Sequence, residues 1–221
     1  MRTVLVVAPH PDDETLGCGG TLLRHGDEGA VLHWLVATRS QAGQGVSRAW
    51  VEERERTIER VAQAYGMVDV HRFEVRPTRL DTVPLAELVA STSEVFEKVR
   101  PDVVYLPHPG DAHSDHRRAF EMCASGGKWF RHPGVSELYA YETLSETGFG
   151  LEASSPFRAT GYMDISATLE RKLEILHEYG DELGDFPFPR SDGAVRALAA
   201  LRGAEAGFAA AEAFQVLRLR R

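Results

Sequence analysis

Short apolar runs alternate with segments of helical periodicity along the first half of the chain. Apolar side chains that recur every three or four residues are typical of a helix with one buried face, whereas short continuous apolar runs are typical of buried strands. The pattern predicts strands at Val4–Val7, Ala30–Ala37, Val68–Val75 and Asp102–Leu106, and helices at Thr15–Glu28, Ala49–Tyr65 and Leu85–Val99.

The second half of the chain is less regular. Its pattern predicts strands at Glu137–Glu142 and Tyr162–Ile165, helices at Ala167–Tyr179 and Ala194–Ala206, and a final edge strand at Ala213–Leu219. The segment Gly180–Asp192 is rich in Gly, Pro and acidic residues, which is typical of a surface loop. No linker or internal repeat divides the chain, so we expect a single domain over residues 1–221.

Strands that alternate with helices predict an α/β fold with a mainly parallel sheet flanked by helices. We expect a Rossmann-like strand order, in which the first and fourth strands are neighbours at the point where the chain reverses direction across the sheet. Ligands of such sheets bind at the carboxyl ends of the strands. The loops that follow these two strands should therefore meet.

Composition narrows the class of protein. The chain has 221 residues and a formal charge of −8, which argues against a protein that binds nucleic-acid phosphates. The two cysteines, Cys18 and Cys123, are far apart, so we expect neither a disulfide scaffold nor a thiolate zinc site. No signal-like leader or membrane-spanning apolar stretch is evident, and we expect a cytoplasmic protein without a membrane anchor.

A glycine-rich segment, Gly17-Cys18-Gly19-Gly20, follows the first loop. Dinucleotide-binding and Walker-type phosphate loops need glycines at other spacings, which this chain lacks. A nucleotide-binding Rossmann protein is therefore disfavoured. We expect these glycines to let the first helix pack closely on the sheet.

Metal-type ligands follow both of the strands that should be neighbours. The first strand ends in Ala8-Pro9-His10-Pro11-Asp12-Asp13-Glu14, and the fourth ends in a loop that carries His108, Asp111, His113, Asp115 and His116. The carboxylates could merely cap the following helices. Capping explains neither His10 nor the two histidines of the second loop, so we favour a metal site.

The residue types suit hydrolysis. A catalytic zinc takes three protein ligands and keeps one position open for water. His10, His116 and one of Asp12 and Asp13 can supply the ligands, and the other carboxylate can accept a proton from water. His113 can donate to an oxyanion, and Asp115 can hold an imidazole in its tautomer.

At these motifs the chain resembles the LmbE-like (PIG-L) zinc-dependent N-deacetylases. The family's A-H-P-D-D-E signature appears as residues 8–14 with one extra proline, and its H-x-D-H signature appears as residues 113–116. The similarity extends over nearly the whole chain. It implies roles for eight residues: His10, Asp13 and His116 as zinc ligands, Asp12 as general base, His113 with Asp115 as oxyanion stabiliser, and Arg48 and Asp81 as sugar contacts.

The resemblance implies a hydrolase that removes an N-acetyl group from an amino-sugar-containing small molecule and releases acetate. Zinc is the expected cofactor, and Fe²⁺ could occupy the same ligands. Two alternatives stay open at this point. The protein could be an amidase for a larger acyl amide or a thiol-sugar conjugate, or a non-catalytic metal-containing sugar-binding protein. A homo-oligomer is possible.

Overall fold

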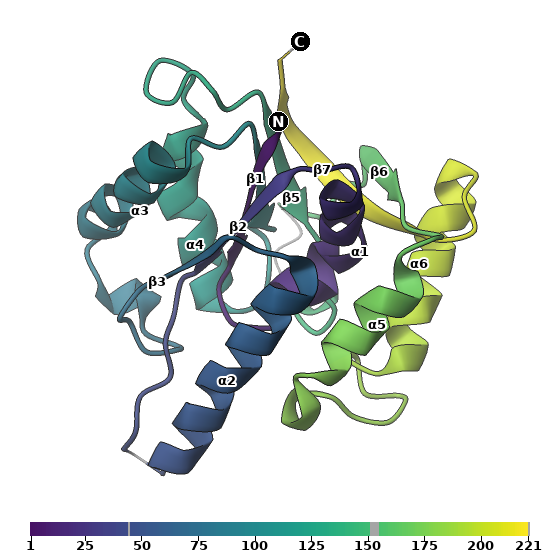
Figure 1. Ribbon diagram of the computed structural model, residues 1–221, viewed down its shortest axis with the longest axis horizontal. Helices are drawn as coiled ribbons and strands as arrows, with labels where there is room; N and C mark the ends of the chain where they lie inside the picture. The colour runs from purple at the N-terminus through teal and green to yellow at the C-terminus, as the bar shows by residue number, and fades with distance from the viewer. Residues whose placement is uncertain (44, 151–154, 221) are drawn as a thin grey trace.

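The computed structural model describes residues 1–43, 45–150 and 155–220, which form a seven-stranded sheet with helices on both faces (Figure 1). The strand order is β3-β2-β1-β4-β5-β7-β6. The strands are β1 (Thr3–Ala8), β2 (Val31–Val36), β3 (Asp69–Arg72), β4 (Val103–Pro107), β5 (Glu137–Tyr141), β6 (Gly161–Asp164) and β7 (Ala211–Leu219). The α-helices are α1 (Asp13–Asp27), α2 (Arg48–Tyr65), α3 (Leu85–Val99), α4 (Ser114–Ala124), α5 (Leu169–His177) and α6 (Asp192–Ala206).

The predicted α/β class and central strand order are confirmed. β1 pairs in parallel with both β2 and β4, and β3 and β5 extend the parallel set on either side. The first and fourth strands are therefore neighbours, as a doubly wound sheet requires. Their carboxyl ends bring the loop after β1 and the loop after β4 to one edge of the sheet.

The last strand differs from the expectation. β7 pairs antiparallel with β5 on one side and with β6 on the other, so that β6 forms the edge of the sheet. The strand predicted at Ala213–Leu219 is confirmed, but its predicted place at the edge of the sheet is wrong. The alternation of apolar and polar residues reports which side of a strand is buried, and it carries no information on whether the strand has one neighbour or two.

Each face of the sheet has its own helices and its own core. Successive side chains of a strand point to opposite faces, so Val4 and Val6 of β1 pack with buried residues of α1, α2 and α5, whereas Leu5 and Val7 pack with α3 and α4. Figure 1 shows these two helix layers on opposite sides of the strands. None of the helices in the described ranges is both long and apolar enough to cross a membrane.

Helix α1 lies close to its neighbours, as its glycines predicted. A Cβ atom built on Gly17 would lie 2.1 Å from Cδ2 of Tyr141 in β5. Glu212 of β7 accepts hydrogen bonds of 2.9 and 2.8 Å from two backbone N–H groups of α1, and Lys172 of α5 donates to the same carboxylate at 2.7 Å. This buried ion pair fixes the helix that begins at the loop after β1.

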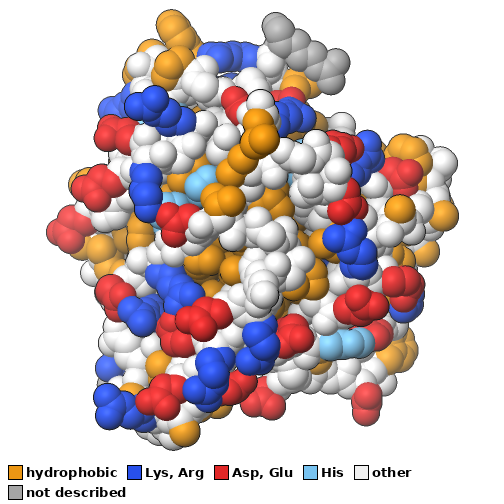
Figure 2. All heavy atoms as spheres, viewed as in Figure 1, with side chains coloured by type: hydrophobic (Ala, Val, Ile, Leu, Met, Phe, Trp, Pro, Cys, Tyr) orange, Lys and Arg blue, Asp and Glu red, His pale blue; other side chains and the backbone are white. Residues whose placement is uncertain are grey.

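Charge is mixed on the face of the molecule that carries α2. Figure 2 shows basic side chains interspersed with acidic ones over this face. Proteins that follow a nucleic-acid backbone cluster Lys and Arg along one face instead.

Candidate active site

The two loops rich in metal-type ligands meet at the carboxyl edge of the sheet. The ring centroid of His10, from the loop after β1, lies 4.6 Å from that of His113 and 5.6 Å from that of His116. Both partners lie at the start of α4, which follows β4. A separation of about a hundred residues along the chain is thus closed by the pairing of β1 with β4, as expected.

The capping alternative accounts for only part of the first loop, where Glu14 Oε2 accepts from the backbone N–H of Asp12 at 3.1 Å. Asp12 precedes α1, and its side chain makes no capping hydrogen bond. Asp13 Oδ2 accepts from the backbone N–H of His10 at 2.9 Å and so ties the loop together. At the second loop His113 itself caps α4, because its Nδ1 accepts from the backbone N–H of Asp115 at 3.0 Å.

His10, Asp13 and His116 form a group that could hold a metal ion, since one ligand atom of each lies within 4.8 Å of the others. Asp13 Oδ2 lies 3.4 Å from His10 Nδ1 and 3.3 Å from His116 Nε2. Ligands about 2.1 Å from a tetrahedral zinc ion lie about 3.4 Å apart. The spacing therefore fits an ion between the three side chains.

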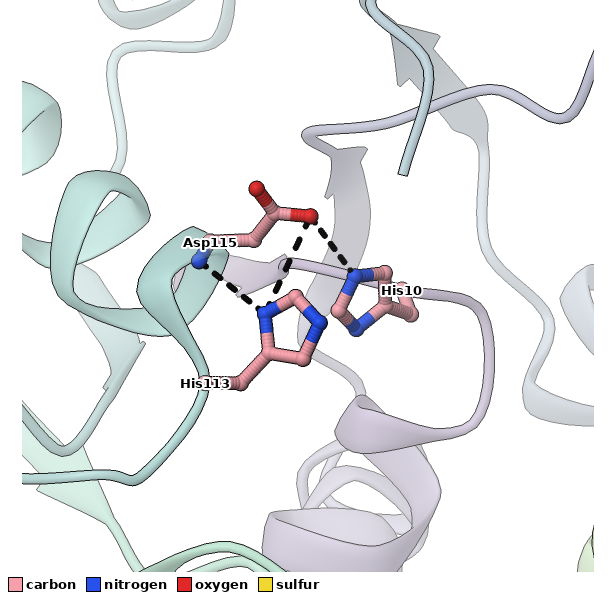
Figure 3. Close-up of side chains that lie close together, drawn as sticks. All are labelled: His10, His113 and Asp115. Atoms are coloured by element: carbon pink, nitrogen blue, oxygen red, sulfur yellow. Dashed lines mark hydrogen bonds and ion pairs between the residues drawn. The ribbon is translucent and has the colours of Figure 1, made fainter. Parts of the chain in front are cut away.

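A second group, His10, His113 and Asp115, satisfies the same distance criterion (Figure 3). Its polar atoms already have partners, however. Asp115 accepts hydrogen bonds from the backbone N–H groups of Thr78 at 2.6 Å and Leu80 at 3.1 Å, and it contacts His10 Nε2 at 3.0 Å. The first group is therefore the better candidate for a metal ion, and Asp115 lies where it can orient His10.

Each of the two imidazoles in this group has a carboxylate on its other side. Asp115 Oδ2 lies 3.0 Å from Nε2 of His10, and Asp111 Oδ2 lies 2.8 Å from Nδ1 of His116. Each contact leaves the opposite ring nitrogen facing Asp13. Carboxylates in this position set the tautomer and orientation of histidines that bind metals. Asp111 was noted in the sequence as part of the ligand-rich loop, but its role as the partner of His116 was missed.

The buried Asp13 and the carboxylates around it determine the charge of the imidazoles. Burial alone would lower the pKa of His10, but hydrogen bonds to Asp115 and Asp13 outweigh it and raise the pKa to about 9. Burial would likewise lower the pKa of His116, but Asp13 and Asp111 outweigh it and raise the pKa to about 10. The two imidazoles hold the pKa of Asp13 below its usual range despite its burial. The group thus favours positive charge at its centre, where a divalent cation can replace two protons.

Asp12 lies beside this group and has different partners. It is 3% exposed, and Arg190 Nη1 donates to its Oδ2 at 2.8 Å. Its backbone has φ 128°, a conformation that residues with a side chain rarely adopt and that recurs at functional sites. Burial, followed by the charge of Asp13, raises the pKa of Asp12 to about 7, although Arg54 and Arg190 oppose the rise. The carboxyl group expected to transfer a proton thus titrates near neutral pH.

His113 presents a hydrogen-bond donor next to the group of His10, Asp13 and His116. Its Nδ1 accepts from the N–H of Asp115, so a neutral ring carries its proton on Nε2. Burial lowers the pKa of His113 and favours this neutral form. Figure 3 shows the ring beside His10, with the contacts to Asp115 on its other edge.

The two expected sugar contacts lie outside this constellation. Arg48 lies in the first turn of α2, where its side chain is 89% exposed and lies 3.6 Å from Glu52. Asp81 is exposed in the 3-10 turn η1 (Leu80–Thr82), one residue after an N–H group that donates to Asp115. Among the described residues, neither side chain makes a hydrogen bond or ion pair with the predicted residues of the two loops: His10, Asp12, Asp13, His113, Asp115 and His116. Their role in sugar binding stays a prediction.

The loop of residues 180–191 contributes a residue that the sequence did not reveal. It lies within the segment Gly180–Asp192, which the sequence predicts to be a surface loop, and much of it is exposed. Its Arg190, however, is the partner of Asp12. No local pattern marks this contact, because the two residues are 178 positions apart and meet only through the packing of α5 and α6.

A family model described as GlcNAc-PI de-N-acetylase (PIG-L) matches residues 5–125, which include both loops of the site. The chain belongs to the PIG-L family. The resemblance expected from the two motifs is thereby confirmed.

Several curated relatives are named as deacetylases. The 1D-myo-inositol 2-acetamido-2-deoxy-alpha-D-glucopyranoside deacetylase of Kineococcus radiotolerans is 31% identical over 54% of this chain and 43% of its own length. The protein of the same name from Saccharomonospora viridis is 28% identical over 81% of this chain and 85% of its own length. The diacetylchitobiose deacetylase of Thermococcus kodakarensis is 24% identical over 96% of this chain and 82% of its own length. The match thus spans less than half of the first relative and most of the other two.

Solved structures confirm the fold. The N,N′-diacetylchitobiose deacetylase of Pyrococcus horikoshii superimposes with a TM-score of 0.79 at 20% identity, covering 98% of this chain and 84% of the other. A conserved protein of Thermus thermophilus superimposes with a TM-score of 0.76 at 27% identity, covering 97% of this chain and 94% of the other. A 4-carboxy-2-hydroxymuconate hydratase of Pseudomonas putida superimposes with a TM-score of 0.78 at 18% identity, covering 100% of this chain and 98% of the other. Because a hydratase shares the fold, the fold alone does not determine the reaction.

Proposed function

We propose that this protein is a divalent-metal-dependent N-deacetylase that removes the acetyl group from an amino-sugar-containing small molecule and releases acetate. The observation that carries the proposal is the convergence of His10, Asp13 and His116 within 4.8 Å, next to Asp12 and His113. Relatives named as deacetylases of acetamido sugars support this class of substrate.

Two imidazoles and one carboxylate form the ligand set of a catalytic zinc site. Bound there, the ion would polarise the amide carbonyl and lower the pKa of a coordinated water to about 7. The same ligands suit Fe²⁺, and we propose zinc because nitrogen and oxygen donors at tetrahedral spacing match its preference.

Asp12 acts as the base. Arg190 engages its Oδ2, whereas Oδ1 accepts no hydrogen bond from any residue that the structure describes. Oδ1 takes a proton from the water that attacks the acetyl carbon. As the C–N bond breaks, the carboxylic acid returns this proton to the amine nitrogen, and acetate and the free amino sugar leave.

His113 stabilises the oxygen that gains negative charge during the attack. Its Nε2–H donor does so without any change of protonation, because the pKa of the ring is lowered and the ring is neutral. The N–H of Asp115 fixes this tautomer, and the Asp115 carboxylate orients His10. Asp115 thus orients both His113 and His10.

Two rival functions predict different products. An amidase for a larger acyl amide or a thiol-sugar conjugate would use the same residues and release a longer acid in place of acetate. A non-catalytic metal-containing sugar-binding protein would bind metal and sugar and release no acid. A cytoplasmic location and a homo-oligomeric state stay predictions.

The test combines metal analysis with a screen for released acid over N-acetylated sugars. We expect the wild-type protein to bind one divalent ion and to release acetate. Asp12→Ala should keep the ion while kcat falls about 10²–10⁴-fold, since this is what a general base contributes. His116→Ala should lose the ion. Near-normal turnover by Asp12→Ala would remove that residue from its role, and a wild-type protein that binds no metal would contradict the proposal.

A further inference from the structure

The loop of residues 180–191, between α5 and α6, is fastened to the base of the proposed reaction. Arg190 Nη1 donates to Asp12 Oδ2 at 2.8 Å and lies 3.4 Å from Oε2 of Glu182 in the same loop. The guanidinium carbon of Arg190 lies 5.5 Å from the ring centroid of Phe188, over whose face it packs. Arg190 therefore has contacts on several sides and reaches Asp12 from a fixed direction.

A second arginine reinforces this connection. Arg54 of α2 donates from Nη2 to the backbone carbonyl of Pro11 at 2.6 Å and lies 3.4 Å from Oε1 of Glu182. Glu182 thus stands between two arginines that hold consecutive residues of the first loop, Pro11 and Asp12. Their side chains are only 13% and 24% exposed, so solvent weakens these contacts little.

Asp12 needs such support for two reasons. Its φ of 128° is unfavourable for a residue with a side chain, so its surroundings must maintain the conformation. Its carboxylate is also buried next to that of Asp13, and like charges in a buried site repel each other. Without a fixed partner, the Asp12 side chain would turn away from its neighbour.

We propose that Arg190 is a positioning residue for Asp12, and that the loop of residues 180–191 is for this reason part of the active site. Arg190 engages one carboxylate oxygen and so presents the other to the reacting water. The inference rests on the proposed function and deepens it. It adds to the site a segment outside the family match at residues 5–125.

The contacts of Arg190 predict that lysine can replace it only in part. Arg190 Nη1 makes both carboxylate contacts, while the planar guanidinium packs over the ring of Phe188. An ammonium is a compact point charge without this planar face. Arg190→Lys should therefore keep a cation near Asp12 and lose the packing on Phe188, and Arg190→Ala should lose both.

The experiment compares Arg190→Ala and Arg190→Lys with Arg196→Ala, a control in which an exposed arginine loses its ion pair with Glu170. Acetate release from N,N′-diacetylchitobiose and N-acetylglucosamine gives kcat and KM. Zinc content is measured on the same preparations. We expect kcat of Arg190→Ala to fall about 100-fold, as for a misplaced catalytic group, with KM changed less than about threefold. Zinc content should be unchanged and Arg190→Lys should recover part of kcat.

The same substitution in the Asp12→Asn background should cause no further loss of activity, because the group that Arg190 positions is already disabled. A kcat of Arg190→Ala equal to that of Arg196→Ala, an effect confined to KM, or a full further loss in the Asp12→Asn background would overturn the inference and leave the proposed function standing. A wild-type protein that releases no acid from any N-acetylated sugar would overturn both.

Discussion

Replacing Asp111 by asparagine removes a charge from the immediate surroundings of the metal group and adds almost no volume. Asp111 is 1% exposed, its Oδ2 lies 2.8 Å from His116 Nδ1, and its Oδ1 accepts from Thr147 Oγ1 at 2.6 Å. The asparagine side chain can still occupy this space. It offers His116 a neutral oxygen or an N–H group in place of a carboxylate.

The expected effect is on metal affinity. Loss of the carboxylate behind a ligating histidine typically weakens metal binding about 10–100-fold, or about 1.4–2.8 kcal/mol. We expect the upper part of this range, because Asp111 and His116 are each only 1% exposed, so that water has little access to replace the lost charge between them. The imidazole would also lose a group that raises its pKa and makes it the stronger ligand.

The assay is competition for Zn²⁺ between the protein and a chromophoric chelator at fixed pH. Asp102→Asn is the matched control, because Asp102 Oδ2 accepts from the backbone N–H of Thr3 at 2.8 Å, at the opposite edge of the sheet. We expect the control to bind zinc as tightly as the wild-type protein. An Asp111→Asn protein whose dissociation constant stays within about twofold of the wild type would refute the reasoning.

Three further predictions follow from the packing and charge of the site. Zinc affinity should rise with pH up to about pH 10, because the pKa values of both imidazole ligands are raised, to about 9 and about 10, and binding must displace their protons. A pH-independent affinity in calorimetry would contradict this. Lys172→Met should lower the free energy of unfolding in urea by about 3–5 kcal/mol, because it leaves Glu212 buried without its cation, whereas the exposed neighbour Arg171→Met should change it by less than about 1 kcal/mol. Gly17→Ala should cost about 1–3 kcal/mol, because its Cβ would lie within 2.1 Å of Tyr141; unchanged stability in the same assay would show that the ring can move aside.

The centre of the fold and the convergence of the two ligand-rich loops were predictable because local patterns determine them. Apolar runs such as Val4–Val7 mark buried parallel strands, and the doubly wound order makes the first and fourth strands neighbours. The ligands lie in the loops directly after these strands, so their convergence follows from topology alone. No side-chain detail was needed to expect His10 close to His116.

The remaining features depend on contacts that a linear pattern does not contain. The internal place of β7 depends on strand pairing at both of its edges, and its own alternation is the same in either case. Arg190 reaches Asp12 across 178 positions, from a loop whose composition indicates only exposure. Asp111 was visible in its loop, but ligand and supporting carboxylate differ by a side-chain direction that the sequence does not specify.

The most direct test of the central claim is anomalous diffraction at the zinc absorption edge from crystals grown with Zn²⁺. The account predicts one strong peak about 2.0–2.2 Å from His10 Nδ1, Asp13 Oδ2 and His116 Nε2. A peak coordinated instead by His113 and Asp115, or no peak at this edge of the sheet, would contradict it.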